Sequence, residues 1–283
     1  MSLVNAIDLI GEAKRKNTAV LAFVCIDYNE VRAVISACER TGKPAICMLL
    51  PEYVTNHRIM DFAAFAAMVK AMAAQTPARI ALHLDHSYDE AEAKRAIECG
   101  FTSIMFDASR DDLETNIRRT RAIVDYAHAR GVAVESELGS VGLAREHAGD
   151  DADLFTKPET VEMFCRETGV DSLAIAIGNA HGDYPLPPNL DLARLDAINA
   201  VTDTALVLHG GSGIPDDQLV ETFRRGINKF HYGTAIKRRY TRAVWEYADA
   251  HRPLQSLDIL GIPALAQDGM ADLIAEKLAL SLL

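Results

Sequence analysis

Histidines and carboxylates follow short apolar runs at several points of the chain, in patterns that could bind a metal ion or move protons. His86, His181 and His209 come from three separate runs. Three neutral imidazoles can hold a zinc-like ion while a fourth position stays open for a substrate oxygen. The five cysteines form no CxxC pair, which predicts reduced core thiols and no thiolate zinc site. A metal site in this chain would therefore use imidazole and carboxylate ligands.

Carboxylates accompany these histidines. Asp85 precedes His86 by one residue, so it should point near the open metal position without binding the ion, where a general acid/base belongs. His83 lies two residues earlier on the same strand face and could orient Asp85, whereas Glu137 is a fourth or alternative ligand. Each of these residues alone could be a packed core residue. Buried together they would destabilise a fold unless a metal or substrate uses them, so the set indicates function.

Two glycine-containing segments offer an anion site. Gly210-Gly211-Ser212-Gly213 stands just before a Pro-Asp-Asp helix start, and Gly233-Thr234 opens the next predicted helix in the same way. Backbone N–H groups at helix N-termini bind phosphate, and the last two loops of a barrel are a usual place for it. The alternative is that HGGSG is only a tight turn.

These side chains need a scaffold that brings the ends of the apolar runs together. Apolar, β-branched runs predict eight strands, and apolar residues at three- and four-residue spacing predict helices between them. Strands alternating with helices imply an α/β protein with parallel pairing, and eight units without a GxGxxG motif fit one (β/α)8 TIM barrel domain over residues 1–283. The predicted strands are residues 19–25, 44–50, 79–85, 102–107, 132–138, 172–177, 205–209 and 228–232.

One segment, residues 139–156, is too rich in Gly, Asp and charge for the core and too long for an ordinary loop between a strand and a helix. We expect it to form a lid over the strand ends. In a barrel the chemistry lies at that face, because each loop there can project a side chain toward the axis.

The composition is that of a globular protein, with 49% hydrophobic and 24% charged residues. A formal net charge of −11 argues against nucleic-acid and membrane-surface partners. The first 17 residues read as an amphipathic helix and not as a signal peptide, and no apolar run is long enough to span a membrane. We therefore expect a cytoplasmic protein that acts on a small molecule.

The motifs ALHLDH (81–86), SIMFDAS (103–109), VESELG (134–139), IGNAHGDY (177–184), VLHGGSG (207–213) and GINKFHYGTA (226–235), in this order, resemble the metal-dependent class II aldolases of the fructose-bisphosphate and tagatose-bisphosphate aldolase family. The resemblance implies that His86, His181 and His209 hold Zn²⁺ or another divalent metal and that Asp85 is the catalytic acid/base. It places Glu137 and Asp107 around a second or alternative metal position. It also implies a homodimer or a homotetramer. It further implies that a monovalent cation (Na⁺ or K⁺) and a ketose phosphate are bound by Gly182, Gly210, Gly211, Ser212 and Thr234.

The chain departs from the family pattern in the substrate pocket. Val24 replaces an Asn near the end of the first strand, and Leu49 or Leu50 replaces a Ser or Thr after the second. His231 and Gly233 replace an Asn and an acidic or small residue, and we assign both to the substrate or phosphate pocket. In the lid, Arg145 stands at the family's catalytic Glu position, with Glu146 one residue along as a weaker candidate for the enolising proton.

The sequence thus predicts a zinc-dependent aldehyde-lyase that reversibly cleaves a ketose phosphate or a related sugar derivative, giving dihydroxyacetone phosphate and an aldehyde. A Schiff-base aldolase is disfavoured because Lys229 enters its strand from the opposite end. Two alternatives remain open. One is a metal-dependent hydrolase or isomerase, which usually shows an HxH motif that the first strand lacks, and the other is a non-catalytic sugar-phosphate-binding subunit.

Overall fold

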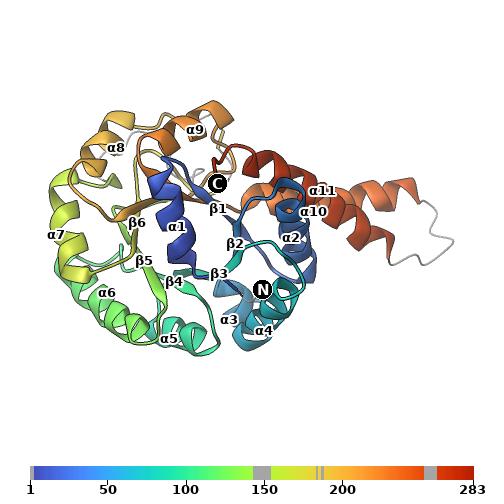
Figure 1. Cartoon of the computed structure of the whole chain (residues 1–283), viewed down its shortest axis with the longest axis horizontal. Helices are drawn as coiled ribbons and strands as arrows, with labels where there is room; N and C mark the ends of the chain where they lie inside the picture. Colours follow the sequence, from blue (N-terminus) through green and yellow to red (C-terminus); the bar gives the residue numbers. More distant parts are fainter. Residues whose placement is uncertain (1–2, 143–153, 183, 186–187, 252–259) are drawn as a thin grey trace.

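Eight parallel strands close into a barrel in the computed structural model, which describes residues 3–142, 154–182, 184–185, 188–251 and 260–283 (Figure 1). Each strand pairs with its neighbours in chain order, and β1 pairs with β8 to complete the closure. The strands are β1 (Val20–Val24), β2 (Ala45–Leu49), β3 (Ile80–Ser87), β4 (Ser103–Phe106), β5 (Ala133–Leu138), β6 (Ser172–Ile175), β7 (Ala205–Leu208) and β8 (Ile227–Tyr232).

Helices surround the barrel, as Figure 1 shows, and most of them connect one strand to the next. The helices within the described residues are α1 (Ala6–Arg15), α2 (Tyr28–Thr41), α3 (Glu52–Thr55), α4 (Phe62–Ala73), α5 (Glu90–Glu98), α6 (Leu113–His128), α7 (Pro158–Thr168), α8 (Leu192–Asn199), α9 (Asp216–Arg224), α10 (Thr234–Ala250) and α11 (Gly261–Leu278).

Local sequence explains where these helices begin and end. The Asp27 side chain caps α2 while Glu30 accepts the Asp27 N–H at 3.0 Å, which is a capping box, and Gly42 ends the helix with a φ of 70°. The side chains of Asp61 and Asp89 also cap α4 and α5, each by accepting two backbone N–H groups of the first turn. Acidic caps after the strands therefore fix the start of several helices that cover the barrel.

Two parts of the chain lie outside the alternation of strand and helix. Helix α1 contacts β1, β3, β7 and β8 and crosses one end of the barrel, whereas α10 and α11 pack on one another and extend away from it (Figure 1). Helix α11 also packs against α2. Within the described residues, no helix is long and apolar enough to cross a membrane.

The barrel interior is partly polar. Cα partners across the parallel ladder place Glu137, Ala174, Val207 and Lys229 at the same level, pointing the same way. A small apolar cluster of Met105, Ala174 and Val207 is separate from the main core, which lies between strands and helices. Charged side chains therefore occupy positions that branched apolar residues usually fill in a barrel.

The predicted architecture is confirmed. All eight predicted runs are strands, with ends within two residues of those predicted. The predicted lid at 139–156 is described only at its ends, where the Ser140 N–H donates to the Leu154 carbonyl at 2.9 Å. Residues 143–153 lie outside the described part of the chain.

Candidate active site

A bulge in β3 places two consecutive residues at the mouth of the barrel. Successive side chains of a regular strand point to opposite faces, so Asp85 and His86 would diverge. The pairing of β3 with β4 shifts register between Leu84 and Ser87, and His86 has a φ of 44°, in the left-handed region that non-glycine residues rarely adopt. Because of this bulge both Asp85 and His86 line the same cavity.

Three imidazoles from three strand ends converge beside it. His86 Nε2 lies 3.2 Å from His181 Nε2 and 2.9 Å from His209 Nδ1, and ring centroids are 4.7 to 5.7 Å apart. One nitrogen from each ring lies within 4.8 Å of the other two. Burial beside the other two rings lowers the pKa of His181 to about 3, so its imidazole is neutral, as a metal ligand must be.

The surroundings of these rings fit a divalent cation. His86 Nδ1 lies 2.9 Å from Asp107 Oδ2, and His209 Nε2 lies 2.9 Å from Glu135 Oε1. With the ring proton on the nitrogen that faces each carboxylate, His86 Nε2 and His209 Nδ1 both present a lone pair to the same point. In that tautomer the two lone pairs, 2.9 Å apart, repel one another unless a cation or a proton lies between them. These three rings are therefore placed where together they could hold a metal ion.

Carboxylates make the same place favourable for positive charge. Burial works against a charged His86, but Asp85, Asp107 and Glu137 outweigh it and raise its pKa to about 10. His86, Asp107 and Glu137 form a second group with ligand atoms within 4.8 Å, as predicted for an alternative metal position. Burial next to Asp107 raises the pKa of Glu137 to about 8, and its Oε2 has no hydrogen-bond partner among the described residues.

Asp85 lies beside this cluster and contacts His231, not His83. His231 Nδ1 is 3.1 Å from Asp85 Oδ1, and its Nε2 is 3.4 Å from Glu135 Oε1. Neither contact has the alignment of a hydrogen bond. Burial opposes the charge of Asp85, but His231 and His86 outweigh it and hold the pKa of Asp85 well below its usual range. The Asp85 carboxylate is therefore ionised.

A buried ion pair supports the site from below. Lys229 Nζ lies 2.8 Å from Glu135 Oε2 and 3.1 Å from His83 Nε2, and all three side chains are almost fully buried. His83 Nδ1 lies 2.8 Å from the Ser103 hydroxyl, so His83 belongs to this layer and has no hydrogen bond to Asp85. Glu135 thus joins Lys229 to the ring of His209. The sequence contained no signal for this link, because Lys229 could equally have faced the outer helices.

The loops after β7 and β8 form a cradle of backbone N–H groups. A Cβ on Gly210 would lie 2.0 Å from the Ala180 carbonyl oxygen, so only glycine allows this approach. The Ser212 hydroxyl accepts the Ala235 N–H at 3.1 Å and ties the two loops together. Within the described part of the chain, the N–H groups of Ser212 and Thr234 donate to no protein acceptor. This pair of loops can therefore bind an anion next to the histidines.

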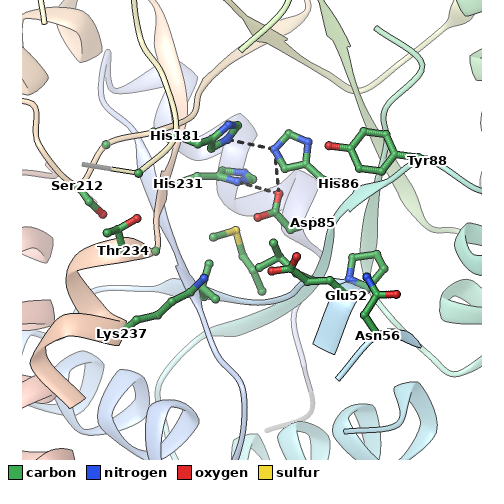
Figure 2. A pocket seen from close by; sticks show the side chains of 18 of the residues that line it. Glu52, Asn56, Asp85, His86, Tyr88, His181, Ser212, His231, Thr234 and Lys237 are labelled. Carbon is green, nitrogen blue, oxygen red and sulfur yellow. Dashed lines mark hydrogen bonds and ion pairs between the residues drawn. The ribbon is translucent and has the colours of Figure 1, made fainter. Parts of the chain in front are cut away.

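A cavity of about 570 Å³ joins the two features, and Figure 2 shows it from close by. The predicted site residues that line it are Asp85, His86, His181, Gly182, Gly210, Gly211, Ser212, His231, Gly233 and Thr234. His209 reaches the site through its contact with His86, and Glu137 and Asp107 lie behind that ring. Arg145 and Glu146 lie outside the described residues.

The residues at strand ends that depart from the family pattern lie either on the cavity wall or in the core. Val24 and Leu50 line the cavity, whereas Leu49 is fully buried in the apolar core. Sequence reasoning missed several polar lining residues. They come from the segments after β2, β3 and β8 and are Glu52, Asn56, Tyr88 and Lys237.

A (β/α)8 barrel with three histidines, an ionised aspartate and an anion cradle at its mouth defines a class of metal-assisted enzymes that act on small anionic substrates. Residues 4–281 match the family model described as "Fructose-bisphosphate aldolase class-II". The chain therefore belongs to the class II fructose-bisphosphate aldolase family and is a carbon–carbon lyase.

Individual relatives agree with this assignment. The chain is 36% identical to a fructose-bisphosphate aldolase of Geobacillus stearothermophilus, over 87% of this chain and 86% of that protein. It is 35% identical to a 6-phospho-5-dehydro-2-deoxy-D-gluconate aldolase of Bacillus licheniformis, over 83% and 80%. The crystal structure of the YdjI aldolase of Escherichia coli K12 superposes with a TM-score of 0.85 at 30% identity, covering 99% and 97% of the two chains.

Proposed function

We propose that this enzyme is a zinc-dependent aldolase that cleaves a ketose 1-phosphate into dihydroxyacetone phosphate and an aldehyde. The family supports the aldolase reaction, and the described site residues support the choice of donor. The observation that carries the proposal is the convergence of three imidazoles beside an ionised Asp85 and an anion cradle.

His86, His181 and His209 would hold the metal, with Glu137 and Asp107 as an alternative position. All three main ligands are imidazoles, which suits zinc among several divalent ions. When bound, the metal supplies Lewis-acid polarisation of the carbonyl and hydroxyl oxygens of the donor.

Asp85 would move the proton of the reaction. In cleavage its carboxylate accepts the proton of the hydroxyl on the carbon that becomes the aldehyde. The carbon–carbon bond then breaks, and its electrons pass to the donor half as an enediolate, which must gain a proton on carbon. Glu146 is the proposed source of that proton.

The cradle would hold the donor phosphate. Free N–H groups of Ser212 and Thr234, close to the N-terminus of α10, suit a phosphate group. Gly182, Gly210 and Gly211 line the same side of the cavity, where we also place a monovalent cation. His231 and Gly233 complete the wall between the cradle and Asp85.

The aldehyde half should differ from that of fructose 1,6-bisphosphate. Val24 and Leu50 offer no hydrogen-bonding group to the hydroxyls that would lie against them, and a site discriminates strongly against unpaired polar groups. The relatives themselves carry names for two different substrates, so the substrate varies among proteins similar to this chain.

A screen of ketose phosphates tests this function. We expect metal-dependent release of dihydroxyacetone phosphate from a ketose 1-phosphate with a less hydroxylated tail, and poor cleavage of fructose 1,6-bisphosphate. A kcat/KM of about 10⁴ M⁻¹s⁻¹ or more for the bisphosphate would contradict the assignment of the aldehyde half. A chain that releases no dihydroxyacetone phosphate from any ketose phosphate would contradict the donor. The homo-oligomer and the cytoplasmic location, without nucleic-acid or membrane partners, stay predictions.

A further inference from the structure

The Asp85 carboxylate faces a ring from β8, and we propose that this ring, His231, is a positioning residue that fixes Asp85 for the proton transfer. The inference rests on the proposed function and concerns its proton step. His231 Nδ1 lies 3.1 Å from Asp85 Oδ1, and Figure 2 shows the two side chains facing one another in the cavity.

Neighbouring rings fix the plane of His231. The His209 ring is stacked on it, with centroids 3.8 Å apart and an angle of 22° between the planes. The His83 ring meets it at 83°, with centroids 5.7 Å apart. His231 is buried between these rings, where close packing leaves little room to turn. Its Nδ1 therefore stays directed toward Asp85.

The other ring nitrogen of His231 faces a carboxylate that is itself held in place. His231 Nε2 lies 3.4 Å from Glu135 Oε1, and Glu135 Oε2 lies 2.8 Å from Lys229 Nζ. Lys229 and His231 are two residues apart on β8, so both point into the barrel. His231 thus connects a buried ion pair to the Asp85 carboxylate.

The unpaired atoms of this contact indicate how it works. Asp85 Oδ1 and both ring nitrogens of His231 are buried without a hydrogen bond in the part of the chain that the structure describes. Unpaired buried polar atoms are costly, and at 3.1 Å only the angle between Nδ1 and Oδ1 has to change to pair them. An N–H on Nδ1 then holds Oδ1.

This contact sets which oxygen of Asp85 meets the substrate. Oδ1 is turned toward two rings, since His86 Nε2 also lies 3.9 Å from it. Oδ2 is left to accept the proton of the substrate hydroxyl as its O–H bond breaks, while His231 keeps its own proton. His231 therefore acts through Asp85 and takes no part in the transfer itself.

The test compares two reactions that depend on Asp85 differently. Cleavage, of whichever ketose phosphate the parent enzyme cleaves fastest in the screen, needs Asp85. Exchange of the hydroxymethyl protons of dihydroxyacetone phosphate with D₂O, followed by NMR without any aldehyde, does not.

His231→Phe retains a ring to stack on His209 and removes both nitrogens. We expect it to lower kcat for cleavage about 10- to 100-fold, with KM, bound zinc and the exchange rate unchanged. His231→Asn should recover most of this loss, because an Asn carries an N–H group on Cγ, as His carries Nδ1.

A double variant shows whether His231 acts through Asp85. In the Asp85→Asn background, His231→Phe should cause no further loss of kcat, because the residue that it positions is already gone. Losses that multiply would overturn the proposal. Loss of zinc, or an equal fall in exchange and cleavage, would also overturn it and assign the effect to His209. A rise in KM at unchanged kcat would instead make His231 a substrate ligand.

His128 provides a matched control, since its Nε2 lies 2.9 Å from an Asp171 oxygen on the outside of the barrel. His128→Phe should leave cleavage and exchange unchanged. If the parent enzyme neither exchanges protons nor releases dihydroxyacetone phosphate, the proposed function fails and the inference fails with it. If the parent does both and His231→Phe cleaves at the parent rate, only the inference is wrong.

Discussion

At the scale of single residues, the site depends on side chains whose charge is set by their neighbours. Asp85 is ionised because His231 and His86 outweigh its burial, and His181 is neutral because it is buried beside two other rings. An ionised carboxylate and a neutral imidazole thus line the same cavity, which is an arrangement that acid–base catalysis can use.

Asp85→Asn tests the proton acceptor. The amide retains the shape of the side chain and cannot accept the proton, so we expect kcat to fall by about 10² to 10⁴-fold with bound metal unchanged. Steady-state kinetics together with metal analysis by mass spectrometry measure both quantities. Cleavage at the parent rate would show that another group removes the proton.

Lys229→Met tests the buried ion pair between Lys229 and Glu135. Removing the lysine leaves Glu135 buried without its cation, which should lower the free energy of unfolding by about 3 to 5 kcal/mol in urea denaturation. The double variant Lys229→Met with Glu135→Gln removes both charges and should recover most of that loss. A loss below about 1 kcal/mol in the single variant would mean that the pair contributes little.

At the scale of elements, regular structure could be predicted and local exceptions could not. The strands were predictable because both faces of a closed parallel barrel are covered, which leaves continuous apolar runs such as VLAFV and AICML. The bulge at His86 was not predictable, because it depends on backbone angles that no residue type in this segment requires. Lys237 was missed because a lysine in the first turn of a helix usually faces solvent.

The candidate site was predictable to the extent that strand ends identify it. His86, His181 and His209 follow strands, and the topology of the barrel alone brings them together. The contact of Asp85 with His231, and not with His83, depends on the direction of side chains inside the barrel. No spacing of residues in the sequence predicts the direction in which these side chains point.

Helix α2 provides a test of pH dependence. Burial next to Asp27 raises the pKa of Glu30 from 4.5 to about 7. The unfolded chain therefore loses this proton at lower pH than the folded chain. The contribution of Glu30 to the free energy of unfolding should be largest below about pH 4.5 and should decline between about pH 4.5 and 7, by about 3 kcal/mol in total.

Glu30→Gln should remove that decline, because the amide oxygen still accepts the Asp27 N–H without a charge. Urea unfolding at about pH 5 and pH 8 measures the difference for parent and variant. Glu39→Gln on the same helix is the control, since Glu39 forms a partly exposed ion pair with Arg32 whose loss has a small effect. The same decline in Glu30→Gln as in the parent would contradict the assignment.

At the scale of the whole molecule, the helices at the two ends of the chain lie at different places on the barrel. Helix α1 crosses the barrel, whereas α10 begins at the anion cradle and then leaves the barrel with α11 (Figure 1). Trp245 on this pair of helices is 73% exposed, which is unusual for so large an apolar side chain. An exposed tryptophan is typical of an interface, and it supports the prediction of a homodimer or homotetramer.

We therefore expect Trp245→Glu to shift the chain toward a smaller assembly in light scattering coupled to size-exclusion chromatography. The parent protein should elute as two or four chains at micromolar concentration. A parent protein that is monomeric under these conditions would contradict the prediction.

We propose that cleavage depends on a divalent metal held by His86, His181 and His209. The most direct test adds zinc to metal-free enzyme and follows both bound zinc and the release of dihydroxyacetone phosphate. We predict that activity rises in proportion to zinc up to about one ion per chain, and that His181→Ala, with the barrel intact by circular dichroism, neither retains zinc nor regains activity. Full zinc occupancy in His181→Ala, or cleavage by the metal-free parent, would contradict the claim.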